Sequence, residues 1–242
     1  MRFLIALLKA VFGGAATPLP TPIVIQGAPV SAPTSRYLSD RQMALIKKHL
    51  PIYQQACGLV QMGPPLIMAG IHYREAEFAT SSQVPGGAFQ LDPGGVGDEL
   101  KNAIVKYTTM VCKLYGVPVK DIETDFFTAC LVAVHELKSK VRVTTAVLPI
   151  DDEALADAFW GYNGRSRHHT EFEQTQKGTM EPHWRWSPYV NNDPKNGIVL
   201  RITGTMPDPK DPTKRIKIDR PDPRPGALMI YREVRARQSE LA

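Results

Sequence analysis

The sequence predicts a mainly α-helical fold with a small β-rich appendage at its C-terminal end. Apolar residues recur at helical spacing through much of residues 37–165, and short strand-like runs separated by turn residues follow later in the chain. The 242 residues, 43% of them hydrophobic and 22% charged, suffice for one globular core without a metal or a disulfide. We therefore expect a helical domain over residues 37–165, and a polar, aromatic and β-rich extension over residues 166–242 that packs on it.

Residues 1–36 are expected to precede this domain as an apolar segment and a linker. Residues 1–16 form a short apolar stretch behind Arg2, which resembles a signal peptide although Lys9 interrupts it. The stretch is too short for a transmembrane helix. The alternative is an amphipathic helix that packs on the body or makes a transient membrane contact. Residues 13–36 have the Gly, Pro, Ala, Ser and Thr content of a linker. Whether residues 1–16 are cleaved stays open.

Two helices are predicted in the first part of the domain. Ser39 and Gln42 form a capping-box pattern, which satisfies the free N–H groups at a helix start. We expect Pro51 to break or kink this first helix. A second helix is expected over residues 64–78, because proline is tolerated in a first turn. Residues 79–97, rich in Gly, Pro and Ser, are expected to form a loop or a small irregular β region.

The rest of the chain is predicted to hold three more helices and then three strands. The helices are expected over residues 98–115, 122–140 and 151–161. The strands, separated by Pro, Asp and Gly turns, are expected at Ile198–Thr205, Arg215–Ile218 and Ala227–Val234.

Charge and cysteine usage limit the classes of partner and cofactor. The formal charge of +5 suits peptidoglycan, wall polymers, phospholipid or nucleic acid, but no nucleic-acid-binding motif accompanies it, so we expect no nucleic-acid partner. The three cysteines fit no zinc pattern and lie in apolar stretches, so buried free thiols are expected, with one disulfide as the alternative. No cofactor and no metal are expected, because standard zinc spacing is lacking among His168, His169, His183, Glu171 and Glu173.

Glu75 is the first candidate for chemistry. It follows Ile67 and Ile71 at intervals of four residues, so all three share one helix face and Glu75 extends a buried stripe. Apolar surroundings favour the neutral form of a carboxyl group, which a general acid needs near neutral pH. The alternative is an exposed Glu at a helix end, paired with Arg74 or His72.

Two later segments carry further candidates. Residues 86–95 read Gly-Gly-Ala-Phe-Gln-Leu-Asp-Pro-Gly-Gly, where glycines allow close approach of backbone to a ligand and Gln90 can bond a sugar amide or hydroxyl. Residues 159–165 read Phe-Trp-Gly-Tyr-Asn-Gly-Arg and place Tyr162 and Asn163 beside aromatic surface. Taken singly, these are an ordinary turn and an ordinary helix end.

Together and in this order, the three segments resemble the motif series of the goose-type lysozyme and soluble lytic transglycosylase superfamily. That series has a catalytic Glu late in a helix, a Gly-rich segment with a pair such as Met-Gln, and an Ala-Tyr-Asn-Ala-Gly type segment. The matching residues here are 72–78, 88–91 and 161–164. Residues 65–234 also resemble phage and bacterial lysozyme-like proteins, through 71–75, 90–95 and 224–226.

The resemblance implies a lysozyme-like helical domain that cleaves the β-1,4 bond between N-acetylmuramic acid and N-acetylglucosamine. Glu75 would be the general acid and base. A lytic transglycosylase needs no second carboxylate, whereas an inverting lysozyme does. Among Glu77, Asp92 and Asp98, the best candidate for that second carboxylate is Asp92. The choice between lytic transglycosylase and muramidase stays open.

The same resemblance implies the partner and the binding residues. Peptidoglycan glycan strands would be the substrate of a monomer that acts on the cell wall, after export or as a phage-delivered endolysin. The implied substrate-binding residues are Gln90, Tyr162, Asn163, Tyr73, Phe89 and Trp184.

Two departures and one aromatic segment leave alternatives open. Ala76 replaces the usual Ser after the Glu, and Phe89 replaces the Met before Gln. Ala76 supports the alternative of a non-catalytic wall-binding or phage structural protein that keeps the fold. The aromatic residues Trp184, Trp186 and Tyr189 could stack on sugar rings, but packing of the extension on the body is the favoured interpretation.

Overall fold

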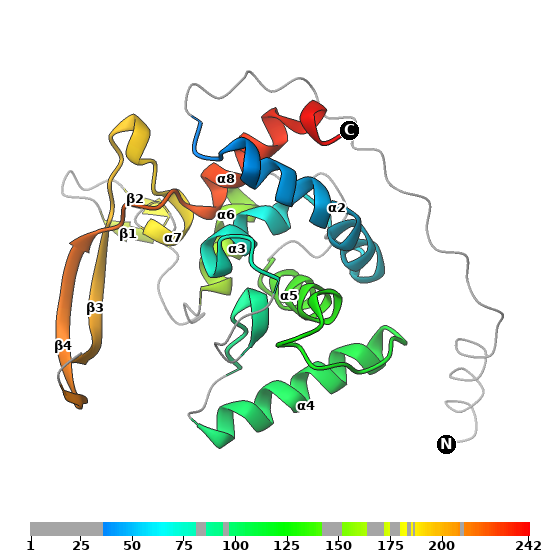
Figure 1. The fold of residues 1–242 in the computed structure, drawn as a ribbon. Coiled ribbons are helices and arrows are strands. Elements are labelled where there is room, and N and C mark those ends of the chain that lie inside the picture. Colours follow the sequence, from blue (N-terminus) through cyan, green and yellow to red (C-terminus); the bar gives the residue numbers. More distant parts are fainter. Residues whose placement is uncertain are drawn as a thin grey trace.

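In a computed structural model, the chain forms a helical body with two separate antiparallel β-hairpins (Figure 1). The structure describes residues 36–80, 86–93, 97–141, 152–163, 172–174, 180–182, 185, 187–208 and 211–242. The prediction of a mainly α fold with a small β portion near the C-terminus is confirmed. Most of the predicted N-terminal segment and linker lies outside the described residues.

The elements follow one another from a helical first half to a mixed second half. The described helices are α2 (Asp40–Val60), α3 (Ile67–Ala76), α4 (Asp98–Leu114), α5 (Phe126–Lys140), α6 (Asp152–Tyr162), α7 (Pro188–Asn191) and α8 (Ala227–Ala236). Short 3-10 turns are η1 (Gly87–Phe89), η3 (Pro194–Asn196) and η4 (Gln238–Leu241). The strands are β1 (Phe172–Gln174), β2 (Met180–Pro182), β3 (Arg201–Asp208) and β4 (Asp211–Pro221). No described helix is long and apolar enough to cross a membrane.

Helix α2 starts with the predicted capping box, but it does not break at Pro51. The Ser39 hydroxyl accepts a hydrogen bond from the Gln42 backbone N–H, and the Gln42 side chain accepts one from the Ser39 N–H. Pro51 does not break the helix, which continues to Val60. Pro51 lies on the exposed side, while the opposite side is buried, so packing of that side outweighs the one lost backbone hydrogen bond.

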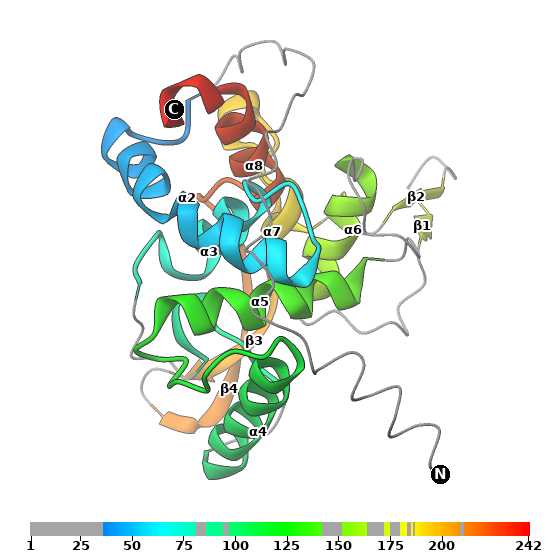
Figure 2. The same cartoon turned by 90° about the vertical axis from the view of Figure 1, so that its right-hand side faces the viewer.

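Helix α3 occupies the centre of the body, between α8 and the η1 turn (Figure 2). Every residue from Ile67 to Arg74 is buried. At Gly70 the two helices meet so closely that a Cβ would come within 2.5 Å of the Ala227 carbonyl oxygen. A glycine at this point therefore lets the start of α8 pack directly on α3.

The predicted strand at Ala227–Val234 is wrong, because this segment is helix α8. Ala227, Ile230, Tyr231 and Val234 are all buried. Their spacing of three, four and seven residues from the first is that of a helix face, and it outweighs the strand preference of the isoleucine and valine. The last part of the C-terminal extension is therefore helical and shares the core of the body.

The other two predicted strands pair as the β3–β4 hairpin, with shifted ends. Strand β3 begins at Arg201 instead of Ile198, and β4 already begins at Asp211. Strands β1 and β2 form a second, much shorter hairpin that the sequence did not reveal. The three cysteines are free and buried, as predicted.

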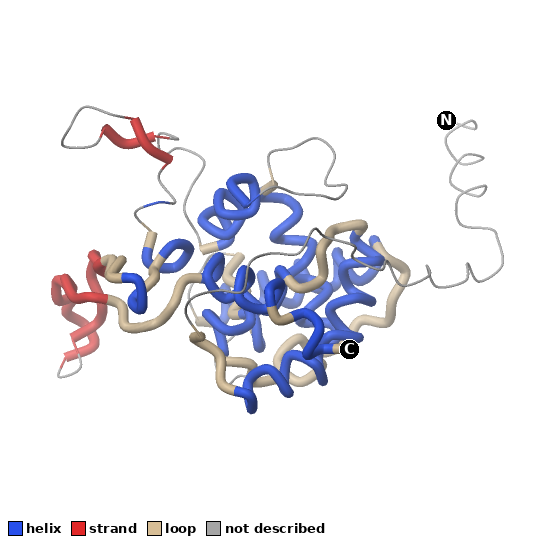
Figure 3. The backbone as a smooth tube through the Cα atoms, turned by 90° about the horizontal axis from the view of Figure 1, so that it is seen from above, coloured by secondary structure: helices blue, strands red, loops and turns tan. Residues whose placement is uncertain are grey.

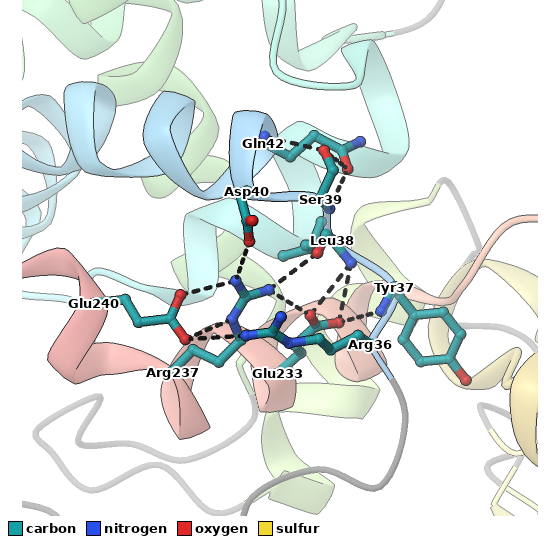
Figure 4. A network of polar contacts seen from close by, with 9 residues as sticks. All are labelled: Arg36, Tyr37, Leu38, Ser39, Asp40, Gln42, Glu233, Arg237 and Glu240. Atoms are coloured by element: carbon teal, nitrogen blue, oxygen red, sulfur yellow. Dashed lines mark hydrogen bonds and ion pairs between the residues drawn. The ribbon is translucent and has the colours of Figure 1, made fainter.

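A polar network joins the start of α2 to the C-terminal end of the chain (Figure 4). The buried Glu233 carboxylate accepts from the backbone N–H groups of Tyr37 and Leu38 and from Arg237 at 2.9 Å. Arg237, itself buried, also donates to the Leu38 carbonyl and to Glu240. Residues nearly 200 positions apart are thus held together by one buried acid and one buried base.

We expect Glu233→Gln to lower the free energy of unfolding by on the order of 3 kcal/mol, because it leaves the buried Arg237 without its buried counter-charge. Urea denaturation followed by circular dichroism measures the change. Arg36→Ala is the control: it removes only an exposed ion pair to Glu240 and should leave the midpoint nearly unchanged. Equal effects of the two substitutions would contradict this account of the network.

Candidate functional site

Glu75 lies in the last turn of α3, one residue before the helix ends at Ala76. The side chains of Ile67 and Ile71 are fully buried and Glu75 is half-buried, so the predicted stripe that ends in a partly buried carboxyl is confirmed. The C-terminal end of a helix carries a partial negative charge, which disfavours a second negative charge there. Both its burial and its place in the helix therefore oppose ionisation of Glu75.

The alternative pairing of Glu75 with His72 or Arg74 is not what the structure has. His72 Nε2 lies 2.6 Å from the Ala79 carbonyl oxygen, so it carries the proton, and Nδ1 accepts from the Tyr53 hydroxyl at 2.7 Å. Burial lowers the pKa of His72 to about 4, so this ring is neutral. The Arg74 guanidinium pairs with Asp222.

The partner of the Glu75 carboxyl is Tyr189, at the start of the short helix α7. Its hydroxyl donates to Oε1 of Glu75 over 2.6 Å. Burial raises the pKa of Glu75, while the Tyr189 hydrogen bond and the charges of Arg74 and Arg224 lower it; burial prevails and the pKa stays raised. Burial, reinforced by the Glu75 charge, also raises the pKa of Tyr189 well above its ordinary value. The phenol is therefore a neutral donor.

A buried ion pair supports Tyr189 from behind. Arg74 lies over the Tyr189 ring, 5.2 Å from its centroid, and its guanidinium is 2.8 Å from Oδ2 of Asp222. Arg74 also donates to the Pro225 carbonyl at 3.2 Å. Burial would raise the pKa of Asp222, but hydrogen bonds from the Arg224 N–H and from Arg74 outweigh it, and the pKa is lowered. Asp222 therefore stays charged opposite Arg74.

The segment that carries Asp222 is itself held by the buried Asn192. Its side-chain amide donates to the carbonyls of Asp222 and Arg224, at 2.8 and 2.6 Å. Its oxygen accepts from the Leu200 N–H at 2.8 Å. Because Asn192 follows directly after α7, one residue fixes the position of α7 relative to the partner of Arg74.

The second and third motifs reach Glu75 through the η1 turn. The Gln90 side-chain amide donates to the backbone carbonyl of Glu75, and the Tyr162 hydroxyl donates to the Phe89 carbonyl at 3.0 Å. Burial, and next the charge of Glu75, raise the pKa of Tyr162 well above its ordinary value. The structure thus brings Glu75, Gln90 and Tyr162 together from three separate segments of the sequence.

The glycines of the second motif serve the fold of the turn. Gly86 and Gly87 have φ angles of 93° and 70°, in the left-handed region that side chains disfavour. A Cβ on Gly87 would lie 2.2 Å from the Ile122 carbonyl oxygen, and one on Gly86 would lie 2.3 Å from that of Leu91. The sequence predicted that these glycines allow backbone to approach a ligand closely. In the structure they allow close contact with the backbone of Leu91 and Ile122.

Of the remaining predicted site residues, those that the structure describes do not surround the carboxyl. Asp92 and Asn163 are exposed, and Asp92 is not among the charges that shift the pKa of Glu75. Tyr73 is buried against Phe78, at 5.7 Å between ring centroids. The Phe89 ring is fully buried and stacks on Phe126, so only its carbonyl takes part in the site. Trp184, Trp186, the three histidines of residues 168–183 and Glu171 lie outside the described residues.

Three residues that matter most around Glu75 were not recognised from the sequence. The sequence favours a packing role for Tyr189 and suggests Arg74 only as a partner of Glu75. Asp222 carried no signal at all, since it lies 148 positions from Arg74. The only available hint was Ser-Pro-Tyr-Val at residues 187–190, where a Pro can open a helix that presents the following Tyr.

Comparisons of the chain with protein-family models, with curated proteins and with solved structures find no match. Within the described residues, no group of three His, Cys, Asp or Glu side chains could hold a metal ion.

We expect Tyr189→Phe to raise the pKa of Glu75 further, because the lost hydrogen bond favours the carboxylate over the neutral acid. Carboxyl-carbon NMR titration of the folded protein measures this pKa. Tyr73→Phe is the control. It also removes a tyrosine hydroxyl, from the residue that precedes Arg74, but this hydroxyl does not affect the pKa of Glu75 through a hydrogen bond. An unchanged or lowered pKa in Tyr189→Phe would contradict the assigned role of this hydrogen bond.

Proposed function

We propose that this protein cleaves the glycan strands of peptidoglycan, with Glu75 as the general acid. The observation that carries the proposal is a half-buried carboxyl with a raised pKa that accepts a hydrogen bond from a buried tyrosine. Two of its neighbours, Gln90 and Tyr162, belong to the segments whose order resembles the lysozyme and lytic transglycosylase series. A raised pKa favours the protonated form of a carboxyl, and that form can donate to a glycosidic oxygen.

The position of Tyr189 orients the proton that would be donated. Because its hydroxyl donates to Oε1, the proton of the neutral acid belongs on the other oxygen, Oε2. When that proton leaves, the carboxylate keeps the Tyr189 hydrogen bond and the nearby charges of Arg74 and Arg224, which favour it. These residues thus stabilise the form of Glu75 that exists after bond cleavage.

The proposed reaction needs only this one carboxyl. Glu75 protonates the oxygen of the β-1,4 bond, the bond to the anomeric carbon of N-acetylmuramic acid breaks, and N-acetylglucosamine leaves with a free hydroxyl. The 6-hydroxyl of the muramic ring then attacks that carbon and returns its proton to Glu75. The products are a 1,6-anhydro end and a regenerated acid, with no water consumed.

The surroundings of Glu75 favour this route over an inverting hydrolysis, which uses a second carboxylate about 6.5–9.5 Å from the acid. The side-chain charges that shift the pKa of Glu75 are those of Arg74 and Arg224, both positive. In the described part of the chain, no acidic side chain contributes to that shift, and the earlier candidate Asp92 is exposed. We therefore propose the lytic transglycosylase as the subclass.

We expect Glu75→Gln to lower the clearing of peptidoglycan embedded in a gel by about 100-fold or more, because it removes the transferable proton. Glu77→Gln is the matched control: it makes the same change two residues on, at an exposed position. Mass spectrometry of the wild-type products should show 1,6-anhydro ends.

Three outcomes bear on the proposal. Equal clearing by wild type and Glu75→Gln would overturn the role of Glu75. Reducing ends in place of anhydro ends would retain a glycosidase but reject the transglycosylase subclass. Binding of peptidoglycan without any turnover by wild type would favour the non-catalytic alternative that Ala76 suggests.

A further inference from the structure

The β3–β4 hairpin stands away from the helical body. Figures 1 and 3 show it to one side of the helices, and its two strands pack mainly on each other. A two-stranded ribbon with no third strand or helix on it is only marginally stable in water.

The two faces of the hairpin differ in character. Directly paired residues share a face and alternate residues along a strand return to it, and Ile202 pairs with Arg220. Ile202, Ile216, Ile218 and Arg220 therefore share one face. The other face carries Lys217 and the Arg201–Asp219 ion pair. One face of the arm is thus apolar with a cation at its base, and the other is polar.

This apolar face is partly open to solvent, and two exposed apolar residues precede it in the chain. Ile216 is 39% exposed, and Ile198 and Val199, just before β3, are 44% and 46% exposed. Isolated exposed apolar side chains are common, but three that lie on β4 and just before β3 are typical of an interaction surface.

The net charge of the β3–β4 hairpin indicates an anionic partner. Residues 201–221 contain six Lys or Arg and three Asp, a net charge of +3 out of the chain's +5. Asp219 and Asp211 are paired with Arg201 and Lys214. Among the residues that the structure describes, Lys217 and Arg220 make no ion pair and are exposed. Two copies of this face would bring like charges together, which disfavours self-association.

We propose that the β3–β4 hairpin docks on the surface of an anionic phospholipid membrane. The isoleucines of one face enter the boundary between headgroups and acyl chains, and Arg220 on the same face pairs with lipid phosphates. Lys217, on the opposite face, adds to the electrostatic attraction toward the anionic surface. The combination of apolar side chains with unpaired cations matches such a surface better than nucleic acid, which offers phosphates but no apolar layer.

The base of the arm connects this surface to the site around Glu75. The chain enters the hairpin at Leu200, whose N–H is bonded to Asn192, and leaves it at Asp222, whose N–H donates to the Leu200 carbonyl at 3.0 Å. Asp222 is the partner of Arg74. A membrane held by the arm would therefore lie at a fixed place relative to Glu75. The proposal does not rest on the proposed catalytic function.

The test is sedimentation of the full chain with vesicles of phosphatidylcholine, with and without phosphatidylglycerol. We expect binding to the anionic vesicles, and weaker binding at high salt. Ile216→Ser with Ile218→Ser, and separately Lys217→Glu with Arg220→Glu, should each reduce the partition coefficient by on the order of tenfold or more. Val105→Ser with Lys106→Glu, exposed on α4, is the matched control and should bind as wild type.

Several results would overturn the proposal. Binding by both hairpin variants at the wild-type level would assign membrane contact to residues 1–16 instead. Failure of wild type to bind anionic vesicles would reject membrane docking. Tighter binding to duplex DNA than to vesicles would indicate nucleic acid as the partner. A dimer that Ile216→Ser dissociates would indicate that the face binds a second copy of the chain. Glu75→Gln should bind vesicles as wild type does, so loss of catalysis and loss of docking are distinguishable.

Discussion

The ion pair between Arg74 and Asp222 is the interaction on which the arrangement around Glu75 depends. It is fully enclosed, with side chains 4% and 0% exposed, and an enclosed charge is tolerated only when its counter-charge and hydrogen bonds are in place. Here those bonds come from the backbone of residues 222–225. Three parts of the chain therefore meet at one guanidinium: helix α3, the return from the β3–β4 hairpin, and Tyr189 on α7.

The pKa of the neighbouring Glu75 carboxyl is shifted in the opposite direction to that of Asp222. Asp222 receives enough hydrogen bonds to stay charged despite its burial, whereas Glu75 receives one from a side chain and its pKa remains raised. Two carboxyl groups near Arg74 thus have pKa values that are shifted in opposite directions, that of Asp222 downward and that of Glu75 upward. This contrast is the physical basis for proposing Glu75, and not Asp222, as the acid.

The sequence predicted those features that local spacing determines. The stripe of Ile67, Ile71 and Glu75, the cap at Ser39 and the buried cysteines all depend on neighbours within one helix. The segment of α8 contains isoleucine and valine, which favour a strand, but its buried residues recur at helical spacing and the segment forms a helix.

What the sequence did not predict depends on contacts across the fold. Tyr189 lies 114 positions from Glu75, and Asp222 lies 148 from Arg74, so no local pattern links them. The motif resemblance supplied Glu75, Gln90 and Tyr162 as a group. The residues that shift the pKa of Glu75 are instead Tyr189 on α7, Arg74 on α3 and Arg224 in the segment before α8, which only the fold brings together. Functional roles for the group remain predictions.

The most direct test of this account is the pKa of Glu75 in Arg74→Lys. Lysine keeps the positive charge but lacks the planar guanidinium that lies over Tyr189 and bonds the backbone of residues 224 and 225. If Arg74 acts by holding Tyr189, NMR titration will show a raised pKa of Glu75 in Arg74→Lys and little further change when Tyr189→Phe is added. The same upward shift in both backgrounds, or no shift in either, would contradict the account.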